Sequence, residues 1–276
     1  PADGKAVKPM PRFSANLTYL FNEKPLLARI AAACAAGFAA IEVQFPYDVP
    51  LDDLDRARRA AGVEWVLLNI PGGDFAKGDR GLGALPDRVA EFRAGVEAAR
   101  RYAERLGVAR VNLLAGIPGP QHDRERCRAT LVDNLRFAAR AFAEIGAIVC
   151  VEPINSHDSP GFFVNRSDEA IAILDAADAA NTAIQYDIYH AQRMEGDLIA
   201  TLARLKPRIG YIQFSDVPNR TEPGHGEINF TNVFAAIDRI GYDGWVGAEY
   251  RPTTPTTEAS LGWFAPWRAA QRVARR

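Results

Sequence analysis

The sequence predicts an α/β protein in which eight parallel strands close into a (β/α)₈ barrel. Short apolar segments alternate eight times with amphipathic segments between residues 13 and 276. Regular alternation of strand and helix patterns indicates parallel strands joined by right-handed crossovers. Eight such units in about 250 residues match the usual size of this barrel.

A doubly wound open sheet is the competing architecture. It usually carries a Gly-rich phosphate-binding turn after its first strand. In this chain the corresponding turn reads Asn-Leu-Thr-Tyr, from residue 16 to residue 19, which favours the closed barrel. We expect residues 1–11, which are polar and Pro-rich, to form a flexible lead-in, and residues 12–276 to form a single catalytic domain.

The strands are predicted where short runs of apolar and β-branched residues occur between turn residues. They are expected at residues 13–17, 39–44, 64–70, 110–114, 147–151, 183–186, 209–212 and 245–248. Pro at the first helical position and Gly just after the last one delimit several helices. Helices are expected at residues 25–36, 51–61, 86–106, 123–145, 197–205, 230–240 and 257–276, with another beginning at residue 167. The loop from residue 71 to 85 contains five glycines, which is typical of a functional lid.

The composition excludes several classes of function. The 33 Lys and Arg residues are balanced by 34 Asp and Glu residues, so no basic surface for nucleic acid is expected. No apolar run is long enough to span a membrane. Three cysteines, Cys34, Cys127 and Cys150, lie in apolar patterns, and this odd number predicts buried thiols in a reducing compartment, the cytoplasm.

Four successive strands are each followed or ended by an oxygen-bearing side chain, namely Glu152, Asp187, Gln213 and Glu249. In a barrel these strand ends meet at one mouth, where active sites lie. Three carboxylates in one place raise one another's pKa unless a cation lies among them. Oxygen ligands suit a hard divalent cation such as Mg²⁺ or Mn²⁺ better than zinc bound by thiolates. The sequence therefore predicts a divalent metal held by these four residues.

Other polar residues near the same strand ends are candidates for binding a substrate. His190, shortly after Asp187, is expected to hold a substrate oxygen or to be an ordinary buried histidine. Arg220 is expected to pair bidentately with a substrate carboxylate or to remain solvated in its loop. Glu42 and Asn69 end the second and third strands, where they face the mouth or fill the barrel.

The motifs around these residues resemble the hydroxypyruvate isomerase family of the xylose-isomerase-like TIM barrels. The resemblance extends from Met10 over the rest of the chain, and its most specific motif is the run from Glu222 to Asn229. The other matching motifs are Glu152-Pro153-Ile154-Asn155, Asp187-x-x-His190, Gln213 and Glu249-Tyr250. The resemblance implies interconversion of hydroxypyruvate and 2-hydroxy-3-oxopropanoate (tartronate semialdehyde), a step of glyoxylate and carbohydrate-acid metabolism. Metal-assisted proton transfer through an enediolate would use Glu152 and Glu249 as base and acid.

Several alternatives remain open at this stage. The nearest is the same reaction on a four-carbon acid, 2-oxotetronate. The loop at residues 74–85 and Arg220 would determine which of the two acids the site accepts. Ketose 3-epimerisation is less favoured, because related epimerases carry His where this chain has Gln213. A multi-zinc nuclease needs more than the four histidines present, and a sensor would bind sugar acids without turnover. The aromatic stretch at residues 261–267 is a core-facing helix or a contact in a homo-oligomer.

Overall fold

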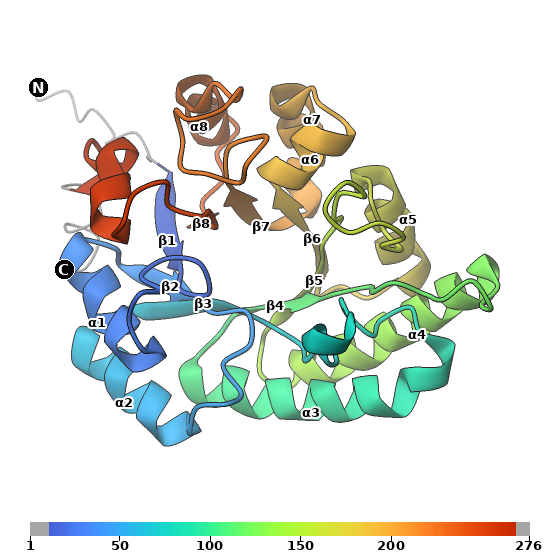
Figure 1. Ribbon diagram of the computed structural model, residues 1–276. Helices are drawn as coiled ribbons and strands as arrows, with labels where there is room; N and C mark the ends of the chain where they lie inside the picture. The colour runs from blue at the N-terminus through green and yellow to red at the C-terminus, as the bar shows by residue number, and fades with distance from the viewer. Residues whose placement is uncertain (1–10, 269–276) are drawn as a thin grey trace, which may run out of the picture.

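The computed structural model describes residues 11–268 and contains a closed barrel of eight parallel strands (Figure 1). The strands are β1 (Arg12–Asn16), β2 (Ala40–Glu42), β3 (Glu64–Asn69), β4 (Arg110–Leu113), β5 (Ile148–Val151), β6 (Thr182–Asp187), β7 (Ile209–Phe214) and β8 (Trp245–Ala248). Each strand pairs with its neighbours in sequence, and β1 also pairs with β8. The predicted barrel is confirmed, whereas the predicted lead-in lies almost entirely outside the described residues.

Helices lie around the outside of the barrel (Figure 1). They are α1 (Leu26–Ala36), α2 (Leu51–Ala61), α3 (Val89–Leu106), α4 (Arg124–Ala143), α5 (Ser167–Ala177), α6 (Ile188–Met194), α7 (Leu198–Leu205) and α8 (Phe230–Arg239). The first three end at Gly37, Gly62 and Gly107, each in the left-handed conformation. A side chain with a Cβ would be strained there, so the glycine signals in the sequence located these helix ends correctly.

Two segments differ from the sequence prediction. Helix α6 begins directly after β6, where a loop was expected, because the Asp187 carboxylate accepts a hydrogen bond from the Tyr189 amide at 2.8 Å and caps the first turn. The final helix, expected at residues 257–276, is instead a 3₁₀ helix over Thr257–Phe264. Residues 269–276 of that prediction lie outside the described part of the chain.

The 261–267 stretch belongs to the core. Leu261 and Phe264 are buried, and the rings of Trp263 and Trp267 lie 5.2 and 5.4 Å from the Phe13 ring of β1 in edge-to-face geometry. Such aromatic packing stabilises the fold beyond the burial of area alone. Of the two roles predicted for this stretch, the structure supports the core-facing one.

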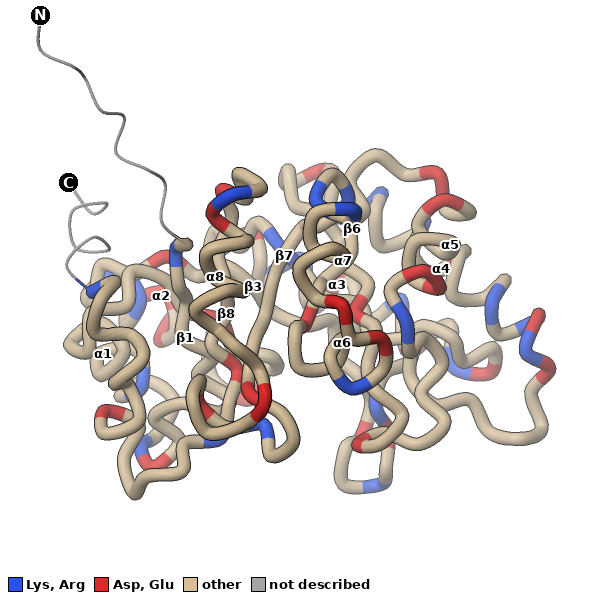
Figure 2. The backbone as a smooth tube through the Cα atoms, turned by 90° about the horizontal axis from the view of Figure 1, so that it is seen from above, with Lys and Arg blue, Asp and Glu red and all other residues tan. Residues whose placement is uncertain are grey.

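The exterior carries both signs of charge. Figure 2 shows Lys and Arg interspersed with Asp and Glu along the described chain. No helix within residues 11–268 is both long and apolar enough to cross a membrane. Cys127 and Cys150 are buried thiols, as predicted, and Cys34 is half-buried.

Candidate active site

The four predicted oxygen donors lie at the carboxyl ends of neighbouring strands. Glu152 directly follows β5, Asp187 ends β6, Gln213 lies near the end of β7, and Glu249 directly follows β8. Asp187 is paired in register with Gln213, and Gln213 with Gly247. All four side chains are buried, so the three carboxyl groups are largely removed from water.

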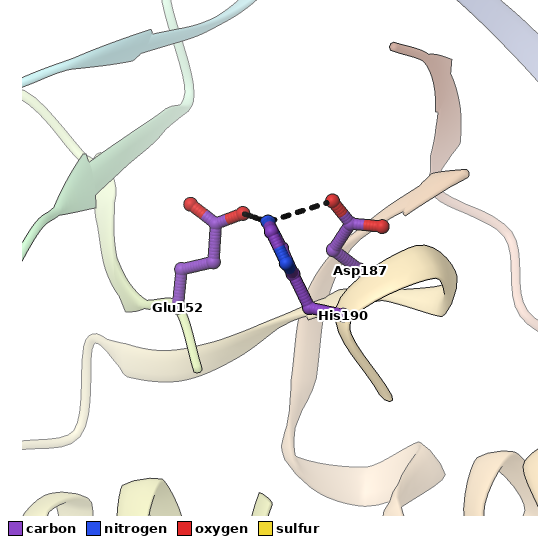
Figure 3. Close-up of side chains that lie close together, drawn as sticks. All are labelled: Glu152, Asp187 and His190. Atoms are coloured by element: carbon purple, nitrogen blue, oxygen red, sulfur yellow. Dashed lines mark ion pairs between the residues drawn. The ribbon is translucent and has the colours of Figure 1, made fainter. Parts of the chain in front are cut away.

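His190 lies between two of these carboxylates (Figure 3). Its Nε2 atom is 3.5 Å from Asp187 Oδ2 and 4.0 Å from Glu152 Oε1. The side chain comes from the first turn of α6, which directly follows β6. Ligand atoms of Glu152, Asp187 and His190 lie within 4.8 Å of one another, which makes this buried group a candidate for holding a metal ion.

Arg220 supplies positive charge to the group. Its Nη2 atom lies 2.5 Å from Glu249 Oε1 and 3.7 Å from Asp187 Oδ2. The guanidinium also lies over the rings of Tyr19 and Tyr189, at 5.0 and 5.1 Å from their centroids. The predicted pairing of Arg220 with a substrate carboxylate would therefore compete with the ion pair to Glu249.

Burial dominates the electrostatics of the site. It raises the pKa of Glu152 well above its usual value, and the charges of Glu249 and Asp187 add to the effect. Burial also raises the pKa of Glu249 to about 7, although the Arg220 guanidinium opposes this rise. The pKa of His190 falls well below its usual range because burial and the nearby Arg220 disfavour the imidazolium. The site thus holds a neutral histidine and carboxyl groups that bind protons more tightly than usual.

Two carboxylate oxygens in this group have no hydrogen-bond partner. Asp187 Oδ2 and Glu249 Oε2 are both buried and unbonded among the described residues, whereas Glu152 Oε2 accepts a 2.6 Å hydrogen bond from Asn112. A buried carboxylate oxygen that accepts no hydrogen bond is costly. These two oxygens are therefore free to bind a hard divalent cation, and the donor set fits the predicted metal.

A cavity of about 750 Å³ opens onto the carboxylates. Its wall includes Glu152, Glu249, His190 and Arg220, together with Arg80 from the Gly-rich loop. This volume lies within the usual range for small-molecule sites. The loop predicted to be a lid thus contributes to the wall of the cavity.

Comparison with known proteins identifies the family. The xylose isomerase-like TIM barrel family model matches residues 30–267. The chain is 46% identical to the 2-oxo-tetronate isomerase of Cupriavidus necator, over 94% of this chain and 99% of the relative. It is 45% identical to the hydroxypyruvate isomerase of Escherichia coli, over 94% of this chain and 100% of the relative. The chain belongs to the hydroxypyruvate isomerase family.

The family membership predicted from the motifs is thereby confirmed. A solved structure from Brucella melitensis, described as an AP endonuclease of family 2, has the same fold. It matches with a TM-score of 0.91 and 40% identity, over 94% of this chain and all of the other.

In this member of the hydroxypyruvate isomerase family, the Gln213 side chain is hydrogen-bonded to Glu42 and Gln185. Its Nε2 donates to both carboxylate oxygens of Glu42 at 3.2 Å, and its Oε1 accepts from Gln185 at 2.5 Å. A carboxamide oxygen has two lone pairs, so one remains for a metal. The role of Gln213 as a ligand stays a prediction.

Sequence reasoning did not single out Asn112, Arg80 or the side chain of Asn155. Asn112 lies in β4 and donates a hydrogen bond to Glu152. Its polar side chain within the otherwise apolar run from Val111 to Leu114 was a signal that could have revealed it. Arg80 lay within the predicted lid but has no motif of its own. The hydrogen bonds from Asn155 to His190 join the loop after β5 to helix α6, which are distant in sequence, and no local pattern reveals such contacts.

Proposed function

We propose that this chain interconverts hydroxypyruvate and 2-hydroxy-3-oxopropanoate through an enediolate. The observation that carries the proposal is the presence of Glu152 and Glu249, two buried carboxyl groups with raised pKa values, on the wall of one cavity. A proton leaves C3 of hydroxypyruvate and another is delivered to C2, while the hydroxyl proton moves from the C3 oxygen to the C2 oxygen. The relatives named as isomerases support this reaction.

Each residue has a distinct part in the proposed reaction. Glu152 and Glu249 act as base and acid, and their raised pKa values suit proton transfer near neutral pH. His190 holds a substrate oxygen, and Arg220 attracts the substrate carboxylate. Mg²⁺ or Mn²⁺ bound by Glu152, Asp187, Gln213 and Glu249 would stabilise negative charge that develops on the substrate oxygens.

The same reaction on 2-oxotetronate is the second candidate. The cavity of about 750 Å³ exceeds the needs of a three-carbon acid, and the relative from Cupriavidus necator carries the name of that activity. A multi-zinc nuclease has less support, because within residues 11–268 only one group of three or more potential metal ligands occurs.

The test is turnover of both acids by protein stripped of metal, assayed with and without added Mg²⁺ or Mn²⁺. Formation of the aldehyde product is coupled to its reduction. Glu152→Gln and Glu249→Gln should each abolish turnover while the circular dichroism spectrum stays native. Glu104→Gln, on the exposed face of α3, is the matched control and should retain activity. Near-normal turnover by either site variant would refute its assigned role.

A further inference from the structure

The ring nitrogen of His190 that faces away from the carboxylates receives two hydrogen bonds from one residue. Asn155 donates to Nδ1 from its side-chain Nδ2 at 2.7 Å and from its backbone amide at 3.3 Å. A backbone N–H can only donate. His190 Nδ1 must therefore present a lone pair and carry no proton.

The orientation of the Asn155 carboxamide is fixed independently. Its Oδ1 accepts a hydrogen bond from the Asp158 amide at 2.9 Å, and its Nδ2 donates to Asp158 Oδ2 at 3.1 Å. Rotating the carboxamide by 180° would set a donor against the Asp158 amide and an acceptor against its carboxylate. Tyr189 donates to the same Asp158 oxygen at 2.7 Å and helps to hold the carboxylate in place.

A neutral imidazole carries one proton, and the nitrogen that holds it is set by the hydrogen bonds of the other nitrogen. With Nδ1 as acceptor, the proton lies on Nε2, the atom that faces Glu152 and Asp187. We infer that Asn155 is a positioning residue that holds His190 in the Nε2–H tautomer. His190 is then a hydrogen-bond donor toward the reacting substrate and not a metal ligand.

This assignment has a consequence for the reaction. A metal ligand needs a lone pair, so an Nε2–H group leaves metal binding to oxygen donors alone. A neutral N–H donor beside the carboxylates stabilises an oxygen on which charge develops during enediolate formation. The catalytic part of the inference rests on the proposed function, whereas the tautomer itself does not.

The tautomer is measurable without turnover. Ring ¹⁵N NMR on protein free of metal and substrate has only four histidines to resolve, and loss of one signal set in His190→Gln identifies His190. We expect a proton-free Nδ1 and a protonated Nε2. A protonated Nδ1 in the wild-type protein would overturn the inference.

Asn155→Asp is the decisive variant, because it sets an acceptor against Nδ1 in place of the side-chain donor. A charged carboxylate in place of the 2.7 Å side-chain donor outweighs the backbone amide, which lies 3.3 Å from Nδ1, so the proton should move to Nδ1. The value of kcat should then fall about 100-fold, the usual effect of losing one oxyanion donor. Asn155→Ala keeps the backbone donor and should keep the wild-type tautomer, which preserves a test if the Asp variant does not fold.

The control is Asn165→Asp, in the same loop. Asn165 donates to the Ile154 carbonyl at 2.9 Å, so this change perturbs the loop and should leave the His190 tautomer as it is. An unchanged tautomer in folded Asn155→Asp would refute the inference and leave Asn155 with a structural role. Failure of the proposed function is separable, because it would give no turnover of either acid while the wild-type tautomer is as expected.

Discussion

Raising the pH should destabilise the protein when no metal is present. Burial raises the pKa of Glu249 from the usual 4.5 to about 7, so the folded chain binds this proton more tightly than the unfolded chain does. The contribution of this bound proton to the free energy of unfolding is complete below pH 4.5 and is lost as the pH rises through 7. A pKa difference of this size corresponds to a loss of about 3 kcal/mol in the free energy of unfolding. The raised pKa of Glu152 acts in the same direction.

Urea unfolding at pH 5, 6, 7 and 8 in the presence of EDTA measures this loss. Glu249→Gln removes the titrating group, so its free energy of unfolding should change less between pH 5 and pH 8, by about 2.5 kcal/mol, since part of the loss occurs below pH 5. Glu104→Gln, with its exposed side chain, should behave like the wild type. Mg²⁺ or Mn²⁺ added at pH 8 should restore stability, because a ligand that binds only the folded state stabilises it. A wild-type free energy of unfolding that is constant or rises from pH 5 to pH 8 would refute the reasoning.

Two further substitutions probe the loops around the cavity. Gly81 has φ +121°, and a Cβ there would lie 2.5 Å from the Leu114 carbonyl oxygen. Gly81→Ala should therefore lower the free energy of unfolding by about 2 kcal/mol, measured by urea unfolding. It should also raise KM, measured by steady-state kinetics. The buried Asp216 accepts four backbone N–H bonds in the loop that carries Arg220. Asp216→Ala should lower the free energy of unfolding by about 3 kcal/mol and reduce kcat, whereas wild-type stability would contradict this role.

The fold was predictable because its signals are local. Each strand is a short apolar run, and glycines such as Gly62 and Gly107 stop the helices that follow. The barrel then brings the strand ends together, so Glu152 and Asp187 could be placed at one site without any contact being known.

The parts that were missed depend on contacts through space. Helix α6 has only seven residues, too few for a periodic pattern, and its cap is also the last residue of β6. The bonds from Asn155 to His190 join the segment after β5 to the segment after β6. The sequence places both residues near the mouth but contains nothing that reveals which ring nitrogen is bonded.

The closure of the barrel determines when the protein can finish folding during its synthesis. β1 pairs with β8, and Phe13 packs against Trp263 and Trp267, so the first strand acquires its last neighbours only after residues 245–267 have left the ribosome. Until then β1 exposes an unpaired edge and an aromatic surface, which are features that promote aggregation of incomplete chains. Residues 245–267 thus complete both the hydrogen-bonded sheet and the aromatic packing around the first strand.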